Sequence, residues 1–255
     1  MAGLVLSYTY YSNHKEFFVS KKAWIIFAVS CLAVIVALVA ASNSNKIDVS
    51  GIKSGEVLAA SEQSGLVPDH VYGKVDSKVV FIEYGDYQCP GCQAAYQPVK
   101  NVVEQYKDHI AFVFRNFPLN QIHPNALAAS AAAESAGLQG KFWEMHDKLY
   151  EDQGAWKSLS PDDRLEEFSN YARELGLNVD TFKTDLGATN VSQKIKFDQA
   201  LGKKINVSAT PSFFFGDTKA ENITDPATNA IDESKLKAAL DSLLKQNGIE
   251  PPTAQ

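Results

Sequence analysis

Two cysteines stand where the hydrophobic pattern of this chain changes from that of a strand to that of a helix. Residues 78–84, KVVFIEY, form an apolar run with β-branched and aromatic side chains, which is typical of a buried strand. Beyond the cysteines, apolar side chains recur at helical spacing, namely Tyr96, Val99, Val103 and Tyr106. The change of period predicts a strand, a turn and a helix, with Cys89 at the helix start and Cys92 one turn inside it.

This pair of cysteines admits four interpretations: half of a zinc site, a structural disulfide, a redox pair or two core residues. A zinc site usually takes four ligands as two pairs, and after residue 41 the chain has only this one pair. His123 and His146 would have to complete the site from more than 30 residues away, so we expect them to be surface or packing residues.

A redox pair explains more of the sequence around the cysteines. The thiolate is the reactive form of cysteine, and a free thiol has a pKa of about 8.5. A helix N-terminus carries partial positive charge and unpaired N–H groups, which would stabilise a thiolate at Cys89. Pro90 suits the first helical position, where its missing N–H costs nothing. Cys92, one turn further on, is placed to resolve a mixed disulfide.

The rest of the chain alternates strand and helix patterns. Further strands are predicted at residues 109–119, which contain IAFVFRNFPL, and at residues 210–217, TPSFFFGD. Several helices are predicted between these two strands, and a last one at residues 233–246, which ends before Gly248. We therefore predict an α/β fold with a helical insertion at about residues 120–205.

The charge of the chain argues against one class of function. The formal net charge is −6, and the part after residue 41 has a net charge of −8. Proteins that bind nucleic acids need a basic face to contact phosphates. An acidic body therefore makes a nucleic-acid partner unexpected.

The N-terminal region contains an uncharged apolar run at residues 23–41, AWIIFAVSCLAVIVALVAA. As a helix it would be about 28 Å long at roughly 1.5 Å per residue, close to the roughly 30 Å of a bilayer's hydrocarbon core. Lys21 and Lys22 precede the run, so the positive-inside rule places residues 1–22 in the cytoplasm. We predict a single transmembrane anchor at residues 23–41, with the catalytic domain on the extracytoplasmic side.

Two alternatives compete with the transmembrane anchor. A cleaved signal peptide is one, since small residues lie near the end of the run. A lipoprotein acylated at Cys31 is the other, but mostly apolar residues follow Cys31 where a polar tether would be expected. We interpret Cys31 as a small apolar residue in the membrane helix. After the anchor we predict a flexible tether at residues 42–67, rich in Ser, Asn and Gly, a domain at 68–250 and a loose tail at 251–255.

Several separated motifs, in order, resemble the DsbA-like thiol–disulfide oxidoreductases of the thioredoxin superfamily. These motifs are EYGDYQCPGC, FRNFPL, HPNALAASAAAESAGLQGKFWEMHDKLY and ATPSFFFGD. The resemblance covers roughly residues 69–247 and implies a thioredoxin fold with a helical insertion. The N-terminal anchor resembles the arrangement in bacteria that tether such an enzyme to the outer face of the cytoplasmic membrane.

The resemblance implies a role for individual residues. Cys89 would be the exposed nucleophile and Cys92 the buried resolving thiol. Glu83 would be a buried acid beneath the pair that helps to move the proton of Cys92. Pro211 would follow a cis peptide bond and lie against the disulfide, and Thr210 would present its backbone to the substrate as an added strand does.

The residues between the two cysteines are Pro90 and Gly91, which we also assign to substrate binding. The strongly oxidising periplasmic member of the family has a His in the second place, which helps to stabilise the nucleophilic thiolate. Gly91 has no side chain that could do so. The sequence therefore defines the class of reaction better than it defines the redox potential of the cysteine pair.

We predict from these features a protein-disulfide oxidoreductase that oxidises cysteines of exported, unfolded proteins through the Cys89–Cys92 disulfide. No cofactor and no metal are expected, and the resemblance implies a quinone-linked oxidase in the membrane that restores the disulfide. The alternatives are a disulfide reductase or isomerase of the same fold and a non-catalytic thioredoxin-fold binding or chaperone module.

Overall fold

The structure is a computed structural model that describes the backbone of residues 20–44 and 47–253. Side chains are described over residues 20–36 and 47–253. The chain divides into two units, one that ends at Lys46 and one that starts at Ile47. Most of the predicted cytoplasmic segment, residues 1–22, lies outside the described residues, as does the end of the predicted tail.

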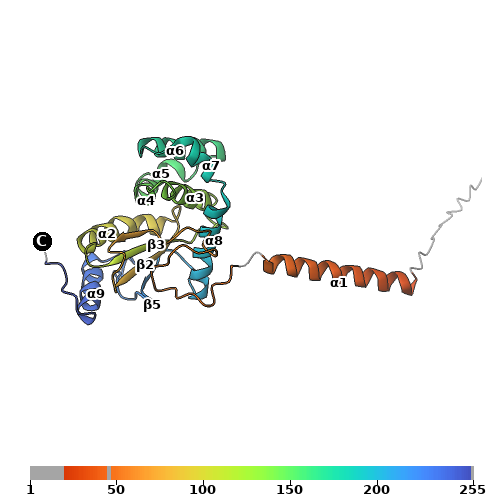
Figure 1. Cartoon of the computed structure of the whole chain (residues 1–255), viewed down its shortest axis with the longest axis horizontal. Coiled ribbons are helices and arrows are strands. Elements are labelled where there is room, and N and C mark those ends of the chain that lie inside the picture. The colour runs from red at the N-terminus through yellow and green to blue at the C-terminus, as the bar shows by residue number, and fades with distance from the viewer. Residues whose placement is uncertain (1–19, 45–46, 254–255) are drawn as a thin grey trace, which may run out of the picture. The chain divides into compact units, whose positions relative to one another are not determined.

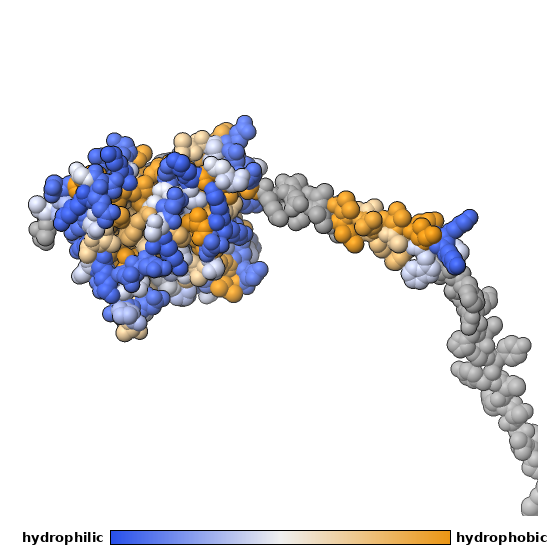
Figure 2. Space-filling view, turned by 90° about the horizontal axis from the view of Figure 1, so that it is seen from below, coloured by the Kyte–Doolittle hydropathy of each residue, from blue (hydrophilic) through white to orange (hydrophobic). Residues whose placement is uncertain are grey.

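The first unit contains one helix, α1, which spans Lys21–Ser44 and covers the apolar run of residues 23–41. Its large apolar side chains over the described residues are exposed and form the hydrophobic surface of this helix in Figure 2. Trp24 and Ile26 are among them. Within the described residues, no helix has the length and apolar character needed to cross a membrane. The predicted transmembrane anchor is therefore not supported, and its last side chains, at residues 37–41, lie outside the described part.

The second unit is built on a mixed five-stranded sheet with the strand order β1-β3-β2-β4-β5 (Figure 1). The central strands β2 and β3 are parallel, while β1 on β3, β4 on β2 and β5 on β4 are antiparallel. The strands are β1 (Val71–Gly73), β2 (Val80–Gly85), β3 (Ala111–Asn116), β4 (Ser212–Phe215) and β5 (Thr218–Lys219). Three were predicted; β1 and β5, at three and two residues, are too short to form a recognisable pattern.

Alternate side chains of β2 point to opposite faces of the sheet, as the two-residue period of a strand requires. Phe81 packs with α2 (Pro90–Tyr106) and α9 (Glu233–Gln246) in one core cluster. Ile82 and Tyr84 pack with α8 (Thr189–Lys204) in another. The sheet is thus covered by helices on both faces, and β2 is buried on both sides. Glu83, in phase with Phe81, belongs to the α2 face.

The helical insertion predicted at about residues 120–205 is present but shorter, because α8 at its end packs on the sheet, and the helices between β3 and α8 gather together in Figure 1. They are α3 (Ala126–Gly137), α4 (Phe142–Glu151), α5 (Gln153–Trp156), α6 (Pro161–Glu174) and α7 (Val179–Asp185). Their apolar side chains form a third core cluster, which also contains Cys89, Cys92 and Phe114. The insertion therefore packs directly against the cysteine pair.

The segment at residues 47–69, here called the N-terminal strap, is packed against the rest of the second unit. Val49 is buried, and Ile47, Ile52, Val57 and Leu58 pack on the cluster around α8. The sequence predicted a flexible tether over residues 42–67, and from Ile47 onward this prediction is wrong. The apolar residues of the strap lie among Ser and Gly residues and follow neither a strand nor a helix period. The sequence pattern therefore gave no indication that they are packed.

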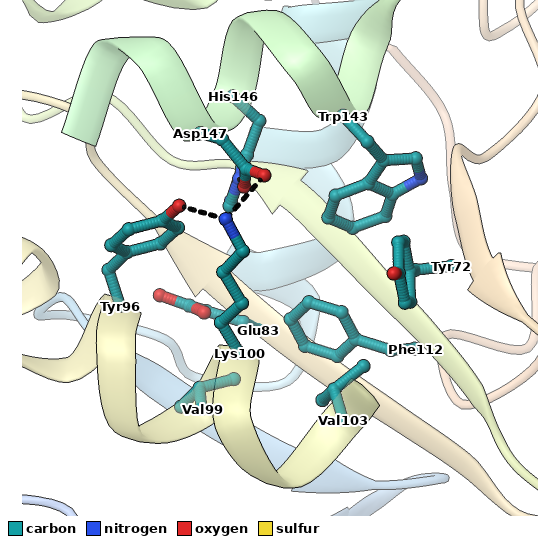
Figure 3. A pocket seen from close by; sticks show the side chains of 10 residues that line it. All are labelled: Tyr72, Glu83, Tyr96, Val99, Lys100, Val103, Phe112, Trp143, His146 and Asp147. Carbon is teal, nitrogen blue, oxygen red and sulfur yellow. Dashed lines mark hydrogen bonds and ion pairs between the residues drawn. The ribbon is translucent and has the colours of Figure 1, made fainter. Parts of the chain in front are cut away.

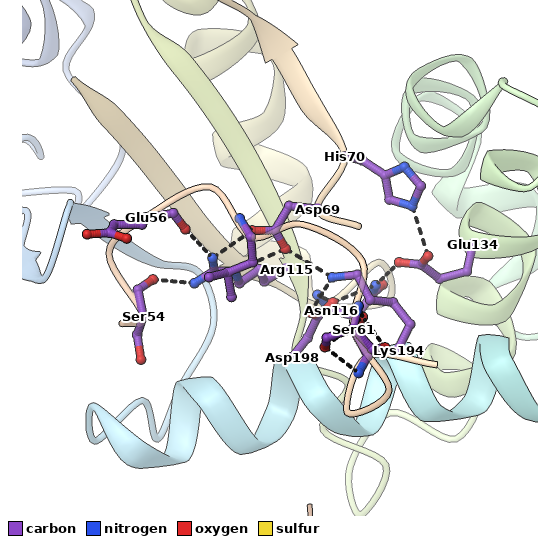
Figure 4. A network of polar contacts seen from close by, with 12 residues as sticks. Ser54, Glu56, Ser61, Asp69, His70, Arg115, Asn116, Glu134, Lys194 and Asp198 are labelled. Atoms are coloured by element: carbon purple, nitrogen blue, oxygen red, sulfur yellow. Dashed lines mark hydrogen bonds and ion pairs between the residues drawn. The ribbon is translucent and has the colours of Figure 1, made fainter. Parts of the chain in front are cut away.

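Buried charges tie the strap to the sheet (Figure 4). Arg115 of β3 donates to the carbonyl oxygens of Ser54 and Glu56 and forms an ion pair of 2.7 Å with Asp69. Lys194 of α8 approaches the same carboxylate at 3.1 Å. Burial opposes ionisation of Asp69, yet the two cations hold its pKa well below the ordinary value. An unpaired buried charge would be strongly destabilising, so all of these groups depend on one another.

Candidate active site

The two cysteines occupy the turn that leads from β2 into α2. Cys89 is the N-cap residue of α2, with extended backbone and no side-chain cap, and Pro90 fills the first helical position as predicted. Both thiols are free. Cys92 is fully buried, whereas Cys89 keeps an exposed fraction of 8%. The expected order of exposure is present, although Cys89 opens to solvent less than an exposed nucleophile would.

The thiol of Cys89 is surrounded by groups that favour its ionised form. A hydrogen bond from the Cys92 thiol lowers the pKa of Cys89 most, and contacts with Thr210 and the backbone N–H groups of Cys92 and Gly91 add to this. Together they outweigh burial and bring the pKa to about 5. The helix start thus supplies the N–H groups that its unpaired first turn was expected to provide.

The thiol of Cys92 is in the opposite situation. Burial raises its pKa well above the ordinary value, and its hydrogen bond to Cys89 and the nearby Glu83 carboxyl add to the effect. The backbone N–H of Asp86 donates to the Cys92 sulfur over 3.5 Å. At neutral pH the pair therefore consists of a Cys89 thiolate and a neutral Cys92 thiol.

The loop before β4 closes the site from the other side. The Thr210–Pro211 peptide bond is cis, as the resemblance implied. The Cys89 sulfur lies 3.4 Å from the Thr210 carbonyl oxygen. A Cβ on Gly91 would lie 3.3 Å from Cδ of Pro211 and 3.7 Å from the Cys89 sulfur. Cys89 and Gly91 therefore meet Thr210 and Pro211, which lie more than 100 positions further along the chain, around one sulfur atom.

Glu83 is buried on the α2 face of the sheet, between Phe114 of β3 and Phe213 of β4. Among the described residues, its Oε1 atom has no hydrogen-bond partner. Burial, and then the charge of Cys89, raise the pKa of Glu83 to about 8. The carboxyl is therefore neutral at pH 7 and electrostatically coupled to both cysteines, as expected for an acid that exchanges a proton with Cys92.

A cavity of about 40 Å³ lies beside Glu83, between β2, α2 and α4 (Figure 3). Its other lining residues are Tyr72, Tyr96, Val99, Lys100, Val103, Phe112, Trp143, His146 and Asp147. His146 is buried here, in agreement with the expectation that it is a packing residue. Among the residues that the structure describes, no group of three His, Cys, Asp or Glu side chains is arranged to hold a metal ion.

Three polar residues that the sequence did not identify hold the backbone of the turn. Asp86, fully buried, accepts hydrogen bonds from the Leu119 N–H at 2.8 Å and from the ring of His123 at 2.7 Å. Gln153 of α5 donates to the carbonyl oxygen of Cys89 at 3.1 Å. Asp86 and His123 belong to the motifs DYQC and HPNA, so their position offered a signal. The sequence around Gln153 gave no such signal, because none of its neighbours along the chain indicates a contact with the cysteines.

This arrangement has the chemistry needed for thiol–disulfide exchange. The Cys89 thiolate is a nucleophile and a good leaving group, and its partner thiol lies within hydrogen-bond reach. Glu83 can supply or accept the proton that Cys92 needs when its sulfur enters or leaves a disulfide.

Comparison with known proteins agrees with this geometry. The sequence profile of a family described as Thioredoxin matches residues 66–241. Among curated proteins, the Na(+)/H(+) antiporter NhaA 1 of Salinispora arenicola is 36% identical over 175 residues, which are 66% of this chain and 26% of that protein. The protein of the same name from Mycolicibacterium vanbaalenii is 33% identical over 63% of this chain and 25% of its own length. The chain thus spans about a quarter of the length of these relatives.

Solved structures share the fold of the second unit. A thioredoxin-like oxidoreductase from Silicibacter pomeroyi is 26% identical, with a TM-score of 0.56 over 73% of this chain and 99% of that one. BdbD from Bacillus subtilis, in its oxidised form, is 23% identical, with a TM-score of 0.56 over 75% and 98%. The thiol–disulfide exchange protein alpha-DsbA2 from Wolbachia pipientis is 22% identical, with a TM-score of 0.57 over 69% and 87%. The last two establish likeness of fold alone.

Proposed function

This chain belongs to the thioredoxin family and is DsbA-like, and from that premise we propose that it oxidises cysteines of exported proteins through a Cys89–Cys92 disulfide. The observation that carries the proposal is the unequal pair of thiols. Cys89 is stabilised as a thiolate beside Pro211, while Cys92 is neutral and buried beside Glu83.

The reaction has two exchange steps. A substrate thiolate attacks the Cys89 sulfur, the Cys89–Cys92 bond breaks, and Cys92 leaves with the electron pair and takes a proton from Glu83. The second substrate thiolate then attacks the substrate sulfur of the mixed disulfide, and Cys89 leaves as a thiolate. The substrate is oxidised by two electrons and the enzyme is reduced by two. Substrate backbone beside Thr210, Pro90 and Gly91 would give binding that is largely independent of side chains.

Return to the disulfide form requires an oxidant, for which a quinone-linked membrane oxidase is our proposal. We place the reaction on the extracytoplasmic side of the bacterial cytoplasmic membrane, where disulfide chemistry is normally carried out. The supporting features are Lys21 and Lys22 before the uncharged run. Detection of the chain in the membrane fraction, with its thiols open to an impermeant alkylating reagent on intact cells, would test the location.

A reductase or isomerase of the same fold is the second candidate. It is favoured by Gly91, which has no side chain that could stabilise the Cys89 thiolate and so make the disulfide more oxidising. Against it stands the low pKa of Cys89, because a stabilised thiolate favours the reduced enzyme and thus makes its disulfide a better oxidant. The equilibrium of the pair with glutathione separates the two: a potential near that of thioredoxin, about −270 mV, would contradict the oxidant role.

The test of the proposed function uses the full chain with its disulfide formed and a reduced, unfolded protein as substrate. Wild type should form substrate disulfides, and Cys89→Ala should lose this activity completely. Cys31→Ala is the matched control, because it removes the third thiol from α1 and should leave the rate unchanged. A Cys89→Ala variant that still oxidises the substrate at the wild-type rate would overturn the proposal.

A further inference from the structure

Glu83 must exchange protons with solvent as well as with Cys92 during the proposed cycle. In the proposed cycle it protonates Cys92 when the disulfide opens and must accept a proton when the disulfide closes. In the reduced enzyme its pKa of about 8 means that it regains a proton at neutral pH before closure. One proton must therefore enter and one must leave per cycle, although the carboxyl is buried at 3% exposure.

The cavity beside Glu83 supplies the first part of a route to solvent. Glu83 Oε1 and His146 Nε2 are both buried atoms without a hydrogen-bond partner in the part of the chain that the structure describes, and both residues line this cavity (Figure 3). The cavity measures about 40 Å³, more than the roughly 10–15 Å³ that one water needs, and although its lining is mostly apolar, Glu83 and His146 both turn a polar group toward it. A water there would give both Glu83 and His146 a hydrogen-bond partner. A buried polar group without a partner costs about 1–3 kcal/mol.

The other ring nitrogen of His146 leads outward. Its Nδ1 lies 3.2 Å from Oδ1 of Asp147, and Oδ2 of the same carboxylate accepts from Lys100 Nζ at 2.8 Å. The side chains of Asp147 and Lys100 are 31% and 41% exposed, whereas His146 is 6% exposed. His146 thus lies between the buried Glu83 carboxyl and a solvent-accessible ion pair, whose two residues also line the cavity.

We propose that His146 relays protons between Glu83 and solvent, through a water in this cavity on one side and Asp147 on the other. The inference rests on the proposed function. His146 acts through Glu83 and does not touch the sulfur atoms, so it is a positioning residue for the proton rather than a catalytic one.

The relay balances over one catalytic cycle. On closure of the disulfide, Glu83 passes its proton through the water to Nε2 of His146, which releases its Nδ1 proton to Asp147 and solvent. Glu83 then accepts the proton of Cys92. His146 is left with its proton on Nε2, ready to donate inward after the disulfide next opens. Nδ1 then takes a proton from solvent through Asp147, which restores the Nδ1–H form.

The groups that face His146 are consistent with this role. They are Glu83 on β2, Tyr87 in the active-site turn, Tyr96 and Lys100 on α2, and Asp147 and Tyr150 on α4. Burial lowers the pKa of His146, so its ring is neutral and able to accept a proton. Burial raises the pKa of each of the three tyrosines, so none of them exchanges protons near neutral pH.

The test follows the reduced full chain, with Cys31→Ala in every protein to remove the third thiol, as it reacts with a chromogenic aromatic disulfide that releases one coloured thiol per step. The first release reports attack by the Cys89 thiolate, and the second reports attack by Cys92 on the mixed disulfide. In His146→Gln the first release should stay within about twofold of wild type. The second should slow about tenfold or more, as expected when proton transfer is impaired.

His70→Gln is the matched control, because His70 also contacts α4, stacked on Phe142 at 3.8 Å, but does not line the cavity. Both release steps should be normal in this control. Imidazole buffer should restore the second step in His146→Ala in proportion to its concentration. In a Glu83→Gln background, His146→Gln should cause no further slowing, because no buried carboxyl remains to be served.

The remaining outcomes show whether the proton relay or the proposed function is wrong. A normal second step in His146→Gln, with no dependence on buffer concentration, overturns the relay. Equal slowing of both steps in His146→Gln also contradicts it, since that result indicates a structural role. Absence of the first step in wild type contradicts the proposed function itself and not the relay alone.

Discussion

At the scale of single residues, the site gives opposite properties to two identical side chains three positions apart. Cys89 sits at the open start of α2 and collects hydrogen bonds that favour its thiolate. Cys92, one turn inside the helix, is enclosed by the insertion and stays neutral. The difference comes from surroundings and not from the sequence between the cysteines, because Pro90 and Gly91 carry no charge.

We predict that the Cys89 thiol of the reduced protein titrates with a midpoint near pH 5, far below the ordinary value. The measurement is the rate of alkylation by iodoacetamide as a function of pH, with Cys31→Ala to remove the third thiol. Cys92→Ser should move the midpoint upward, since the hydrogen bond from Cys92 lowers the pKa of Cys89 most. A wild-type midpoint above pH 7.5 would contradict the assignment of a stabilised thiolate.

Replacement of Glu83 by Gln should stabilise the reduced protein at high pH. The folded-state pKa of about 8 lies above the ordinary value of 4.5, so the folded form holds this proton more tightly than the unfolded chain. The resulting stabilisation is complete below pH 4.5 and is lost as the pH rises to 8. The loss is on the order of 4 kcal/mol at pH 8.

Urea denaturation of reduced wild type and Glu83→Gln at pH 5 and pH 8 measures this effect. Cys89 contributes the opposite slope, because its pKa is lowered, so the quantity of interest is the difference between the two proteins. Glu83→Gln should gain on wild type between pH 5 and pH 8. An equal difference at both pH values would show that the buried carboxyl does not change its ionisation in this range.

At the scale of elements, the helical insertion holds the turn that carries the cysteines through hydrogen bonds. Gln153, at the first position of the short helix α5, is buried and donates to the carbonyl oxygens of Tyr87 and Cys89 at 2.9 Å and 3.1 Å. Gln88 in the turn donates to the Lys157 carbonyl oxygen at 2.7 Å. These bonds connect β2, α2 and the insertion around the reactive sulfur.

Gln153→Ala should therefore reduce the free energy of unfolding by about 2 kcal/mol, because it leaves the buried Tyr87 carbonyl without this donor, whereas the Cys89 carbonyl keeps the N–H of Gln93 at 3.1 Å. Gln139→Ala is the matched control, since Gln139 also donates to a backbone oxygen, that of Asn178 at 3.2 Å, but in an exposed position. The control should cost less than about 0.5 kcal/mol. Similar losses in both variants, measured by urea denaturation, would show that the Gln153 bonds add nothing beyond an exposed contact.

At the scale of the whole second unit, the N-terminal strap is fastened by buried charge. Arg115, with no exposed side-chain surface, bonds to two strap carbonyl groups and to Asp69, and Lys194 joins Asp69 to α8. Loss of one member leaves the others uncompensated in a buried site. The strap is therefore part of the folded unit, whatever lies N-terminal to it.

Arg115→Met should cost about 3–5 kcal/mol of stability and should expose residues 47–67 to proteolysis. Lys204→Met is the matched control, because Lys204 also bonds to strap carbonyl oxygens, those of Ser50 and Ile52, but from an exposed position. The control should cost less than about 1 kcal/mol. If limited proteolysis cuts the strap equally in wild type and Arg115→Met, the charged contacts do not hold it.

Much of this architecture was predictable because it rests on local pattern. The last helix begins and ends where its leucine spacing predicted, at Glu233 and Gln246. Cys89 precedes a helix that starts at Pro90 because the period of the apolar residues changes there. The strap was predicted wrongly because its apolar residues follow neither a strand nor a helix period, and its remaining contacts include backbone carbonyl groups, which have no signature in the sequence.

The sequence alone determined the alternation of strands and helices, the position of both cysteines at a helix start, and the family resemblance from which the roles of Glu83 and Pro211 followed. These features depend on spacing along the chain, which the side-chain periods of strand and helix record. The tertiary structure alone decided how the two thiols differ, which groups hold the turn and where a proton can leave Glu83. Those properties depend on burial and on contacts such as that between Cys89 and Thr210, 121 residues apart, and so they exist only once the chain is folded.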